Sequence, residues 1–431
     1  MTPPSGPELW RSLRLGRAGL RVSGHALGDG LRARLTGRER DWQPIADELR
    51  ATLGELKGPV LKLGQTLSQW REVLPDPITE ALTSLRADVD PVPWQRLRPR
   101  LSHALGQSPE QVFAWIDEQP LAAASLGQVH RARLPDGTAV VIKVQYPGMA
   151  RICEADLRQL RRLLPLGRLF GLPAERLEAV HTELARTIRR ELDYQVERAT
   201  IERFRERCAH RDDIVIPRPL PAYCTSRVLT LTDEPAHTLD QACQWPAELR
   251  HGLARTLVDW AAETMLAQGE LHADPHPGNF GFRPDGRLVV YDLGCTVDVT
   301  QRLADAYAGG FRALQRGDPE ALETAMQALG SRRAGTKPPW SLYREMIRIT
   351  SPVLQPGIAW DFGNGELHRE AMALGSRLTE WIGDLQPPAE AMLINRTLDG
   401  HYWTLHALGA ELDLDALLAP RLSARDGRPG R

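Results

Sequence analysis

The pattern of apolar and polar positions divides the chain into a helical beginning, a short strand-rich stretch and a long helical remainder. Residues 1–118 have mostly helical periodicity, which is broken at Gly58-Pro59, from Pro75 to Pro77 and from Pro91 to Pro93. Two strands are then predicted at residues 125–134 and 139–145. The turn sequence Pro-Asp-Gly-Thr between them predicts a tight hairpin.

Helical periodicity returns after this hairpin. Long helices are predicted at about residues 149–166 and 174–209, and the second of them contains almost no helix breaker. Short strands are predicted at residues 214–216 and 227–232, and the chain is mainly helical from about residue 237. A small strand-rich unit is therefore expected to precede a larger helical unit.

A second hairpin interrupts the helical part. Residues 280–291 read as two short strands that turn at Pro284-Asp285-Gly286. Because antiparallel strands bring their far ends together, this hairpin is expected to carry Asp292 back beside Asn279. Asp274 lies five residues before Asn279, which is the separation that a protein-kinase catalytic loop keeps between its base and its metal-binding amide.

These three side chains suit magnesium-assisted phosphoryl transfer. Mg²⁺ prefers oxygen ligands such as those of Asn279 and Asp292, and it neutralises the charge on the phosphates. Asp274 is a candidate base that orients the attacking hydroxyl group. The sequence therefore makes the chain a candidate nucleotide-using enzyme.

Lys143 lies in an otherwise apolar strand, Val140-Val-Ile-Lys-Val144. An unpaired buried charge is costly, so this lysine needs a partner, and Glu191 and Glu197 follow on the predicted long helix. On a continuous helix these glutamates point about 120° apart, so only one of them could meet Lys143. The alternative is an edge-strand lysine beside an ordinary charged helix face.

Two weaker motifs lie upstream. The segment Ala122-Ala-Ala-Ser-Leu-Gly-Gln-Val129 stands where a glycine-rich phosphate loop would precede the first hairpin, but it has alanines where glycine is usual. Alanine resists positive φ, so the backbone should approach phosphates less freely. Further upstream, Lys62 and Gln65 share a helix face around Gly64, which on its own describes a solvent-facing lysine and a tolerated glycine.

Taken together, these motifs resemble those of the UbiB/ABC1/ADCK (AarF-like) family of atypical kinases. The resemblance covers roughly residues 50–300 and continues more weakly into the helical C-terminal region. Its elements are Lys62-x-Gly-Gln65, the alanine-rich loop, Val-Ile-Lys143-Val-Gln-Tyr-Pro-Gly, Glu191-x-Asp193, His-Ala-Asp274-Pro-His-Pro-Gly-Asn279-Phe and Asp292-Leu-Gly.

The resemblance implies an α+β, two-lobed, protein-kinase-like fold with a helical N-terminal extension that crosses the active site. The expected domains are the extension (1–118), the kinase-like N-lobe (119–235), the helical C-lobe (236–422) and a disordered tail (423–431). The segment Thr230–Glu234 would be the hinge, but its match is too poor to name adenine contacts. There is no C-terminal pair of membrane spans as in bacterial UbiB proteins.

The resemblance also implies roles by position. Lys143 would bind phosphates and pair with Glu197, while Lys62 and Gln65 would lie across the site and meet Glu191, occluding protein substrates. The expected catalytic residues are Asp274, Lys143 and Lys62, and the expected Mg ligands are Asn279 and Asp292. The expected nucleotide-binding residues are Ala123, Ala124, Ser125, Gly127, Gln128, Lys143, Glu197, Glu191 and Gln65.

The implied function is that of an Mg-dependent, ATP-binding atypical kinase or ATPase in isoprenoid-quinone or other lipid metabolism, acting on no protein substrate. The phosphoryl acceptor is not predicted. The alternative is a catalytically weak, nucleotide-gated protein that binds or presents a lipid. A degenerate pseudokinase would be expected to have lost a metal-site residue, and none is missing here, which favours nucleotide chemistry.

Composition and charge limit the classes of partner that the protein is expected to bind. The 431 residues are 42% hydrophobic and 25% charged, with a formal net charge of −1, which gives no global reason to expect nucleic acid. The cysteines are five in number and show no paired C-x-x-C spacing, so reduced thiols in a cytoplasmic protein are expected. The sequence has no window of about 18 apolar residues that lacks charges, so no membrane-spanning helix is expected. The oligomeric state is not predicted.

Two local features carry rival interpretations. The arginine-rich segment 11–40 is expected to be a solvated helical face, and peripheral contact with anionic membrane is the alternative. His272 and His276 flank Asp274 in a His-x-Asp-x-His pattern typical of metal ligands. However, Pro275 and Pro277 exclude the helical i,i+4 pair of a zincin, so histidines that brace the loop are expected.

Overall fold

The computed structural model describes residues 42–44, 46, 47, 50, 77, 80, 91–123, 126–163, 174–375, 377–381 and 383–426. Several expectations fall outside these residues and are not addressed by the structure. They concern the arginine-rich segment 11–40, Lys62, Gly64, Gln65, the loop residues Ala124 and Ser125, and residues 427–431.

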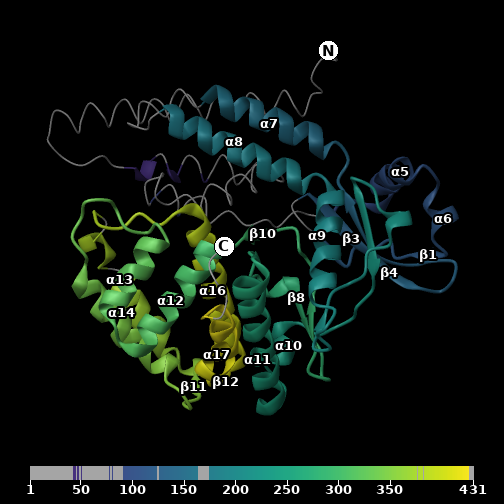
Figure 1. The fold of residues 1–431 in the computed structure, drawn as a ribbon. Helices are drawn as coiled ribbons and strands as arrows, with labels where there is room; N and C mark the ends of the chain where they lie inside the picture. Colours follow the sequence, from purple (N-terminus) through teal and green to yellow (C-terminus); the bar gives the residue numbers. More distant parts are fainter. Residues whose placement is uncertain are drawn as a thin grey trace. The chain divides into compact units, whose positions relative to one another are not determined.

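The chain forms two compact units. The first comprises the described residues up to Ala199 together with Arg218–Asp233, and the second comprises Thr200–Pro217 and the chain from Glu234 onward. Most strands of the first unit belong to one antiparallel sheet, whereas the second unit is mainly helical (Figure 1). The chain is therefore a mixed α+β protein.

The sheet of the first unit is built on the predicted first hairpin. β3 (Gly127–Arg133) and β4 (Ala139–Gln145) pair antiparallel, and β4 also pairs with β6 (Val228–Thr232). Gly137 takes a φ of +86° in the turn, and Asp136 accepts a hydrogen bond from the Thr138 amide. The hairpin prediction is confirmed. It could be made from the sequence because the turn depends on neighbouring residues alone.

One face of β4 is apolar and packs on a helix. Val140, Ile142 and Val144 are fully buried, and they share a core with α5 (Trp94–Leu105). Lys143 points to the opposite face because side chains alternate along a strand. The helix beginning at Trp94, a residue that was assigned to the N-terminal extension, therefore shares its core with this sheet.

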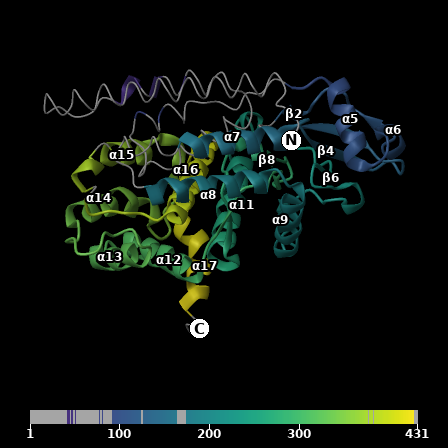
Figure 2. The same cartoon turned by 90° about the horizontal axis from the view of Figure 1, so that it is seen from above.

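α7 (Met149–Leu163) and α8 (Ala174–Glu191) run side by side in both views of the fold (Figure 2). Their buried residues join Tyr146 and Leu126 in a second core cluster of the first unit. This packing explains the amphipathic periodicity of both segments.

The prediction of one continuous helix over residues 174–209 is wrong. α8 ends at Glu191, and α9 (Tyr194–Arg207) begins after Asp193, whose side chain accepts a hydrogen bond from the Gln195 amide. An aspartate in this position starts a new helix by satisfying an amide that the helix leaves unpaired. Glu191 and Glu197 thus lie on different helices, and the 120° argument does not apply to them.

The remaining elements of the first unit are short. They are α6 (Pro109–Val112), β1 (Trp115–Ile116), β2 (Ala122–Ala123) and the 3₁₀ turn η2 (Pro221–Tyr223), and α9 continues from this unit into the second.

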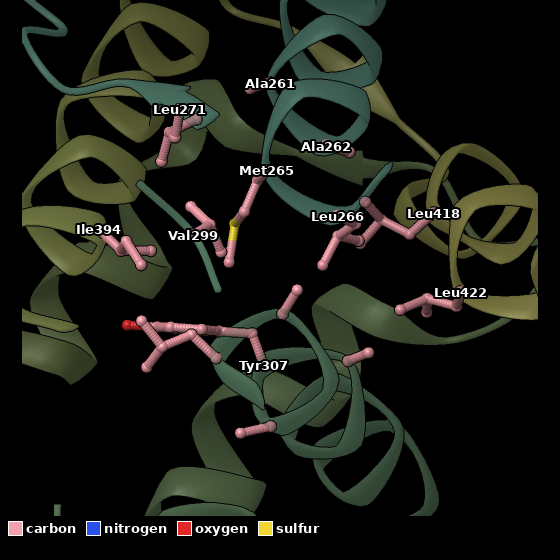
Figure 3. Packing of buried hydrophobic residues seen from close by; sticks show 14 of the residues in the cluster. Ala261, Ala262, Met265, Leu266, Leu271, Val299, Tyr307, Ile394, Leu418 and Leu422 are labelled. Atoms are coloured by element: carbon pink, nitrogen blue, oxygen red, sulfur yellow. The ribbon is translucent and has the colours of Figure 1, made fainter. Parts of the chain in front are cut away.

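The core of the second unit is formed by helices around the catalytic-type loop. Met265 and Leu266 from the π-helical turn η3 (Thr264–Gln268) meet Tyr307, Leu418 and Leu422 from two other helices (Figure 3). Leu271 and Ile394 belong to the same cluster, so it reaches the strand that precedes the loop. This core holds the strand from which the loop begins.

The second predicted hairpin is also present. β8 (Phe280–Phe282) and β9 (Leu288–Val290) pair antiparallel, and Gly286 takes a φ of +86° in the turn. β5 (Ile214–Val215) adds a parallel strand to β9. The hairpin prediction is confirmed, including its turning point.

The other elements of the second unit are mostly helices. They are α10 (Leu239–Ala242), α11 (Ala247–Glu263), β7 (Glu270–His272), η4 (Pro277–Asn279), β10 (Thr296–Asp298), α12 (Gln301–Arg316), α13 (Pro319–Ala328), α14 (Trp340–Thr350), η5 (Ser351–Leu354), β11 (Trp360–Asp361), η6 (Phe362–Asn364), α15 (Glu366–Gly375), η7 (Leu378–Trp381), α16 (Ala389–Leu408), β12 (Glu411–Leu412) and α17 (Leu414–Asp426).

Residues 423–426, which were assigned to the tail, belong to α17. Among the residues that the structure describes, no helix combines the length and the apolar character needed to span a bilayer.

Candidate active site

Lys143 in the first unit is held by a two-pronged ion pair. Its Nζ donates to Glu197 Oε1 at 2.8 Å and to Oε2 at 2.9 Å, and the two side chains are only 18% and 10% exposed. The pair joins the polar face of β4 to the first turn of α9. Because both charges are largely removed from water, each is costly without the other.

Tyr194 and Gly127 lie close to the Lys143–Glu197 pair. Its Nζ lies over the ring of Tyr194, 5.3 Å from the ring centroid. A side chain at Gly127 would overlap both the Tyr194 hydroxyl group and the carbonyl oxygen of Val144. Glycine is therefore required here for close packing, in the segment where a phosphate loop was expected.

The other expected nucleotide-binding residues of this unit occupy different settings. Ala123 is exposed on β2 and pairs with Gln128 on β3. Gln128 is fully buried, and its side chain bonds both the amide and the carbonyl of Val92. It thus ties the segment before α5 to the sheet. Glu191 is half-buried at the end of α8.

The catalytic-type loop of the second unit brings Asp274 and Asn279 together. The Asn279 Nδ2 donates to the Asp274 carbonyl at 3.1 Å and to its Oδ2 at 2.9 Å. The 3₁₀ turn η4 makes this contact by folding back the chain between Asp274 and Asn279, which are separated by four residues. With its nitrogen used in this way, Asn279 keeps its amide oxygen as the atom suited to a metal ion.

Asp292 returns to the same place on the hairpin. The Tyr291 amide donates to the Asn279 carbonyl at 2.9 Å, directly before Asp292. Asp292 Oδ1 accepts from the Gly294 amide at 2.8 Å, which fixes the orientation of the carboxylate. Asn279 and Asp292 thus lie at the joined end of one short hairpin.

Tyr291 anchors this end of the hairpin. Its hydroxyl group donates to the Glu234 carbonyl at 2.9 Å, and Glu234 also pairs with Arg283. A side chain at Gly281 would overlap the Tyr291 ring and Ala236. The position of Asp292 is therefore set by tight packing of its neighbour.

The strand before the loop is held by a buried carboxylate. Glu270, only 4% exposed, accepts from Arg203, Arg207 and Thr296. Burial disfavours the ionised form of Glu270, but these partners outweigh burial, so its pKa lies below the ordinary value. Sequence reasoning missed this residue, although a charged residue in an apolar stretch is a signal that a partner exists.

Of the two histidines that were expected to brace the loop, only His276 does so, because neither ring nitrogen of His272 has a hydrogen-bond partner among the described residues. His276 Nδ1 accepts from the Gly278 amide at 3.0 Å, as expected of a loop-bracing histidine. His272 is fully buried among Trp260 and Phe280, and burial lowers its pKa although the charges of Asp274 and Asp292 act in the opposite direction.

A metal site on protein side chains alone is not seen in the described part of the chain. There, no group of three or more His, Cys, Asp or Glu side chains is placed to hold a metal ion. The oxygens of Asn279 and Asp292 fit a different arrangement, because Mg²⁺ commonly takes one or two protein ligands and completes its shell with water and phosphate oxygens.

A second buried histidine lies next to this site. His401 on α16 packs edge-to-face against Phe280, and neither of its ring nitrogens has a hydrogen-bond partner among the described residues. Burial, helped by nearby His272, lowers the pKa of His401 to about 3. The ring is therefore neutral in the folded protein.

This histidine should make the fold sensitive to mild acid. Below a pH of about 6.5 the unfolded chain protonates His401 and the folded chain does not, so stability falls as the pH falls toward the folded pKa. We expect wild type to lose about 2 kcal/mol more than His401→Phe between about pH 6.5 and pH 5. Urea unfolding of both proteins at the two pH values measures this, with His103→Gln on an exposed part of α5 as the control. Equal losses in wild type and His401→Phe would contradict it.

α16 also contributes groups that sequence reasoning missed. Arg396 lies 3.9 Å from Asp274 Oδ1, and Gly400 packs directly on Pro275. No motif marks these residues, because they lie far along the chain from the loop that they contact.

The chain is similar to known proteins both in sequence and in structure. Residues 84–326, more than half of the chain, match the model of the ABC1 atypical kinase-like domain. The atypical kinase coq-8, mitochondrial, of Caenorhabditis elegans is 27% identical over 418 residues, which cover 94% of this chain and 54% of that protein. Protein ACTIVITY OF BC1 COMPLEX KINASE 8, chloroplastic, of Arabidopsis thaliana is 31% identical over 294 residues, covering 66% of this chain and 38% of that protein.

A solved structure is also similar along nearly its whole length. The complex of Rv3197 with erythromycin from Mycobacterium tuberculosis superposes with a TM-score of 0.64 at 25% identity, covering 90% of this chain and 97% of that one. The chain spans about half the length or less of the two curated relatives named above. Given the extent of the domain match, the chain belongs to the ABC1 atypical kinase-like family.

Proposed function

We propose that this protein is an Mg-dependent ATP-using enzyme, an atypical kinase or ATPase, whose two units correspond to the two lobes of a kinase-like fold. The observation that carries the proposal is the contact of Asn279 with Asp274 at the end of the hairpin that returns Asp292. A base candidate and two hard oxygen ligands converge there, in a chain whose family is kinase-like.

In the proposed reaction an acceptor oxygen bonds to the γ-phosphorus of ATP, and the bond from that phosphorus to the β–γ bridging oxygen breaks. The electron pair of the broken bond leaves on ADP, and the acceptor's proton passes to the Asp274 carboxylate. Lys143, held by Glu197, offers its ammonium group to the phosphates. Mg²⁺, held by Asn279 and Asp292, would neutralise phosphate charge.

The acceptor is proposed to be water or a small lipid-related molecule such as an isoprenoid-quinone precursor. This rests on the family resemblance, in which the extension with Lys62 and Gln65 meets Glu191 across the site and excludes protein substrates. Ala123, Ala124, Ser125, Gly127 and Gln128 are proposed to line the nucleotide site, and Lys62 to act in catalysis. Peripheral contact of segment 11–40 with anionic membrane remains part of this proposal.

Metal removal tests the proposal directly. Full-length protein with ATP and MgCl₂ should release ADP in step with phosphate or a phosphorylated acceptor, and an excess of EDTA should abolish release. Added MgCl₂ should restore it, because the phosphates' charge is unscreened without the metal. The free energy of unfolding of the ATP-free protein should be the same with and without EDTA, which shows that the metal acts on the reaction and not on folding.

Two outcomes distinguish the alternatives. Tight binding of Mg-ATP without any turnover would favour the nucleotide-gated, lipid-presenting protein over the enzyme. Absence of both binding and turnover would overturn the proposed use of ATP.

A further inference from the structure

α16 forms one side of the catalytic-type loop. At Gly400 an added Cβ would overlap the ring of Pro275, the residue that follows Asp274. A proline ring is stiff, so the two backbones can approach this closely only because residue 400 has no side chain. α16 is thus seated on the loop itself, although the helix lies outside the matched family domain, which ends at residue 326.

The helix is also fixed from its other side. Ile394 is fully buried in the core cluster that contains Leu271, from the strand preceding the loop (Figure 3). The Tyr307 hydroxyl group donates to Asn395 Oδ1 at 2.9 Å and to the Ala391 carbonyl at 3.1 Å. The core and these hydrogen bonds set the rotation of α16, and Arg396 follows directly after the anchored residues.

Arg396 faces the loop one helical turn before Gly400. Its Nη2 lies 3.9 Å from Asp274 Oδ1, while the other carboxylate oxygen of Asp274 accepts from Asn279. The contact is too long for a hydrogen bond, and about half of the Arg396 side chain is exposed. Within the described residues it makes no other ion pair. The guanidinium group is therefore near Asp274 without being locked to it.

The loop has no cation of its own. The residues between Asp274 and Asn279 are Pro, His, Pro and Gly, so neither lysine nor arginine lies in it. The side chains that the loop and its hairpin place here, Asp274 and Asp292, are both acidic. Mg²⁺ would neutralise part of the negative charge that gathers on phosphate oxygens beside Asp274, and a further positive group there would stabilise the rest.

We propose that Arg396 is a further catalytic residue, which supplies from α16 the positive charge that the catalytic loop lacks. This inference rests on the proposed function. When the acceptor oxygen bonds to the γ-phosphorus and the bond to ADP breaks, Arg396 donates N–H groups to the transferring phosphoryl group. It gains and loses no proton, and the acceptor's proton goes to Asp274 as before.

The location of Asp274 supports this role. A base must lie within hydrogen-bond distance of the acceptor oxygen, so the reacting group must be close to the Asp274 carboxylate. A guanidinium group beside that carboxylate is then close to the reacting group as well. Arginine suits the task because its planar fork of N–H groups matches phosphate oxygens and stays charged at every relevant pH.

The competing interpretation is an ordinary surface ion pair. Such a pair contributes little to stability and nothing to chemistry. The two interpretations differ in a measurable way, because a transition-state contact changes turnover and the binding of a transition-state mimic, whereas a surface pair changes neither.

The test compares Arg396→Met, Arg396→Lys and a matched control, Arg348→Met. Arg348 on α14 is similarly exposed and pairs with Glu345 on the same helix and with Glu370 on α15. We expect Arg396→Met to lower kcat about 100-fold while the Kd for Mg-ATP changes less than about threefold. Arg396→Lys should recover part of kcat, since it keeps the charge but not the fork. Arg348→Met should behave as wild type.

Calorimetry provides a readout that does not depend on turnover. Binding of Mg-ADP with fluoroaluminate, a mimic of the transferring phosphoryl group, should weaken in Arg396→Met by about the same factor as kcat. Wild-type values of kcat and of mimic binding in Arg396→Met would overturn the inference and leave the proposed function intact. A wild-type protein without ATP binding or turnover would instead overturn both.

A second variant tests the contact of α16 with the loop at Gly400. Gly400→Ala should lower kcat and reduce the Tm, because the added methyl group must push the helix or Pro275 aside. Gly252→Ala in α11 is the control, since an added Cβ there meets no atom within 4 Å. If Gly400→Ala keeps the wild-type kcat and Tm, α16 does not support the loop as proposed.

Discussion

Asp292→Asn is expected to lower Mg-ATP turnover by about 100- to 1,000-fold, with little effect on the free energy of unfolding. The substitution removes a negative charge and keeps the size and shape of the side chain. Asparagine retains a carbonyl oxygen that can accept from the Gly294 amide, which is the contact that fixes Asp292 in the hairpin. What is lost is the anionic oxygen ligand, and Mg²⁺ binds a neutral amide oxygen more weakly than a carboxylate.

The same hairpin provides the matched control. Asp285 lies in its turn, where it pairs with Arg287 on the surface, with both side chains nearly half exposed. Asp285→Asn removes the same charge from the same hairpin and should keep wild-type turnover, since an exposed pair contributes about 0–1 kcal/mol. Phosphate release over a range of MgCl₂ concentrations measures both variants. Equal losses in the two would attribute the effect to hairpin stability, and wild-type turnover in Asp292→Asn would remove Asp292 from the metal site.

The two hairpins could be predicted because their signals are local. In each, a Pro-Asp-Gly sequence supplies a left-handed glycine, Gly137 or Gly286, and an aspartate that accepts from the backbone two residues on. Once the turn is fixed, the register of short antiparallel strands follows. The meeting of Asn279 with Asp292 was therefore readable from the chain.

The break between α8 and α9 was equally local but was missed. Asp193 is a helix-starting residue, and the segment Glu-Leu-Asp-Tyr contains no glycine or proline to mark the interruption. Both helices have helical spacing of apolar residues, so the pattern of apolar and polar positions shows no interruption at the break. The consequence for the site is that Glu197 reaches Lys143 from the start of a helix and not from its middle.

The contributions of α16 could not be predicted. Gly400 and Arg396 have no motif, and their importance comes from contact with Pro275 and Asp274, which lie far away in the sequence. The same is true of the buried network in which Glu263 on α11 accepts from Arg211 and Arg421. A buried acid signals that a partner exists, but only the tertiary fold decides which arginine it is.

Lys143→Met should separate two roles of the Lys143–Glu197 pair. We expect it to weaken Mg-ATP binding about 10- to 100-fold, since a charge-assisted contact to phosphate contributes about 1.5–3 kcal/mol. It should also destabilise the fold by about 3 kcal/mol, because the buried Glu197 then loses its ion pair with Lys143. Glu197→Gln in the Lys143→Met background removes the buried negative charge, so the double variant should regain much of the lost stability.

The double variant should not regain affinity for ATP, because the ammonium group is still missing. Urea unfolding and calorimetric titration with a non-hydrolysable ATP analogue measure the two effects separately. Arg98→Met is the control for loss of an ion pair, since Arg98 and Glu110 pair on the exposed surface of the same unit, and it should alter neither quantity by a large amount. If the double variant recovered both stability and affinity, Lys143 would serve only to neutralise Glu197. The phosphate contact would then have to come from other residues of the site.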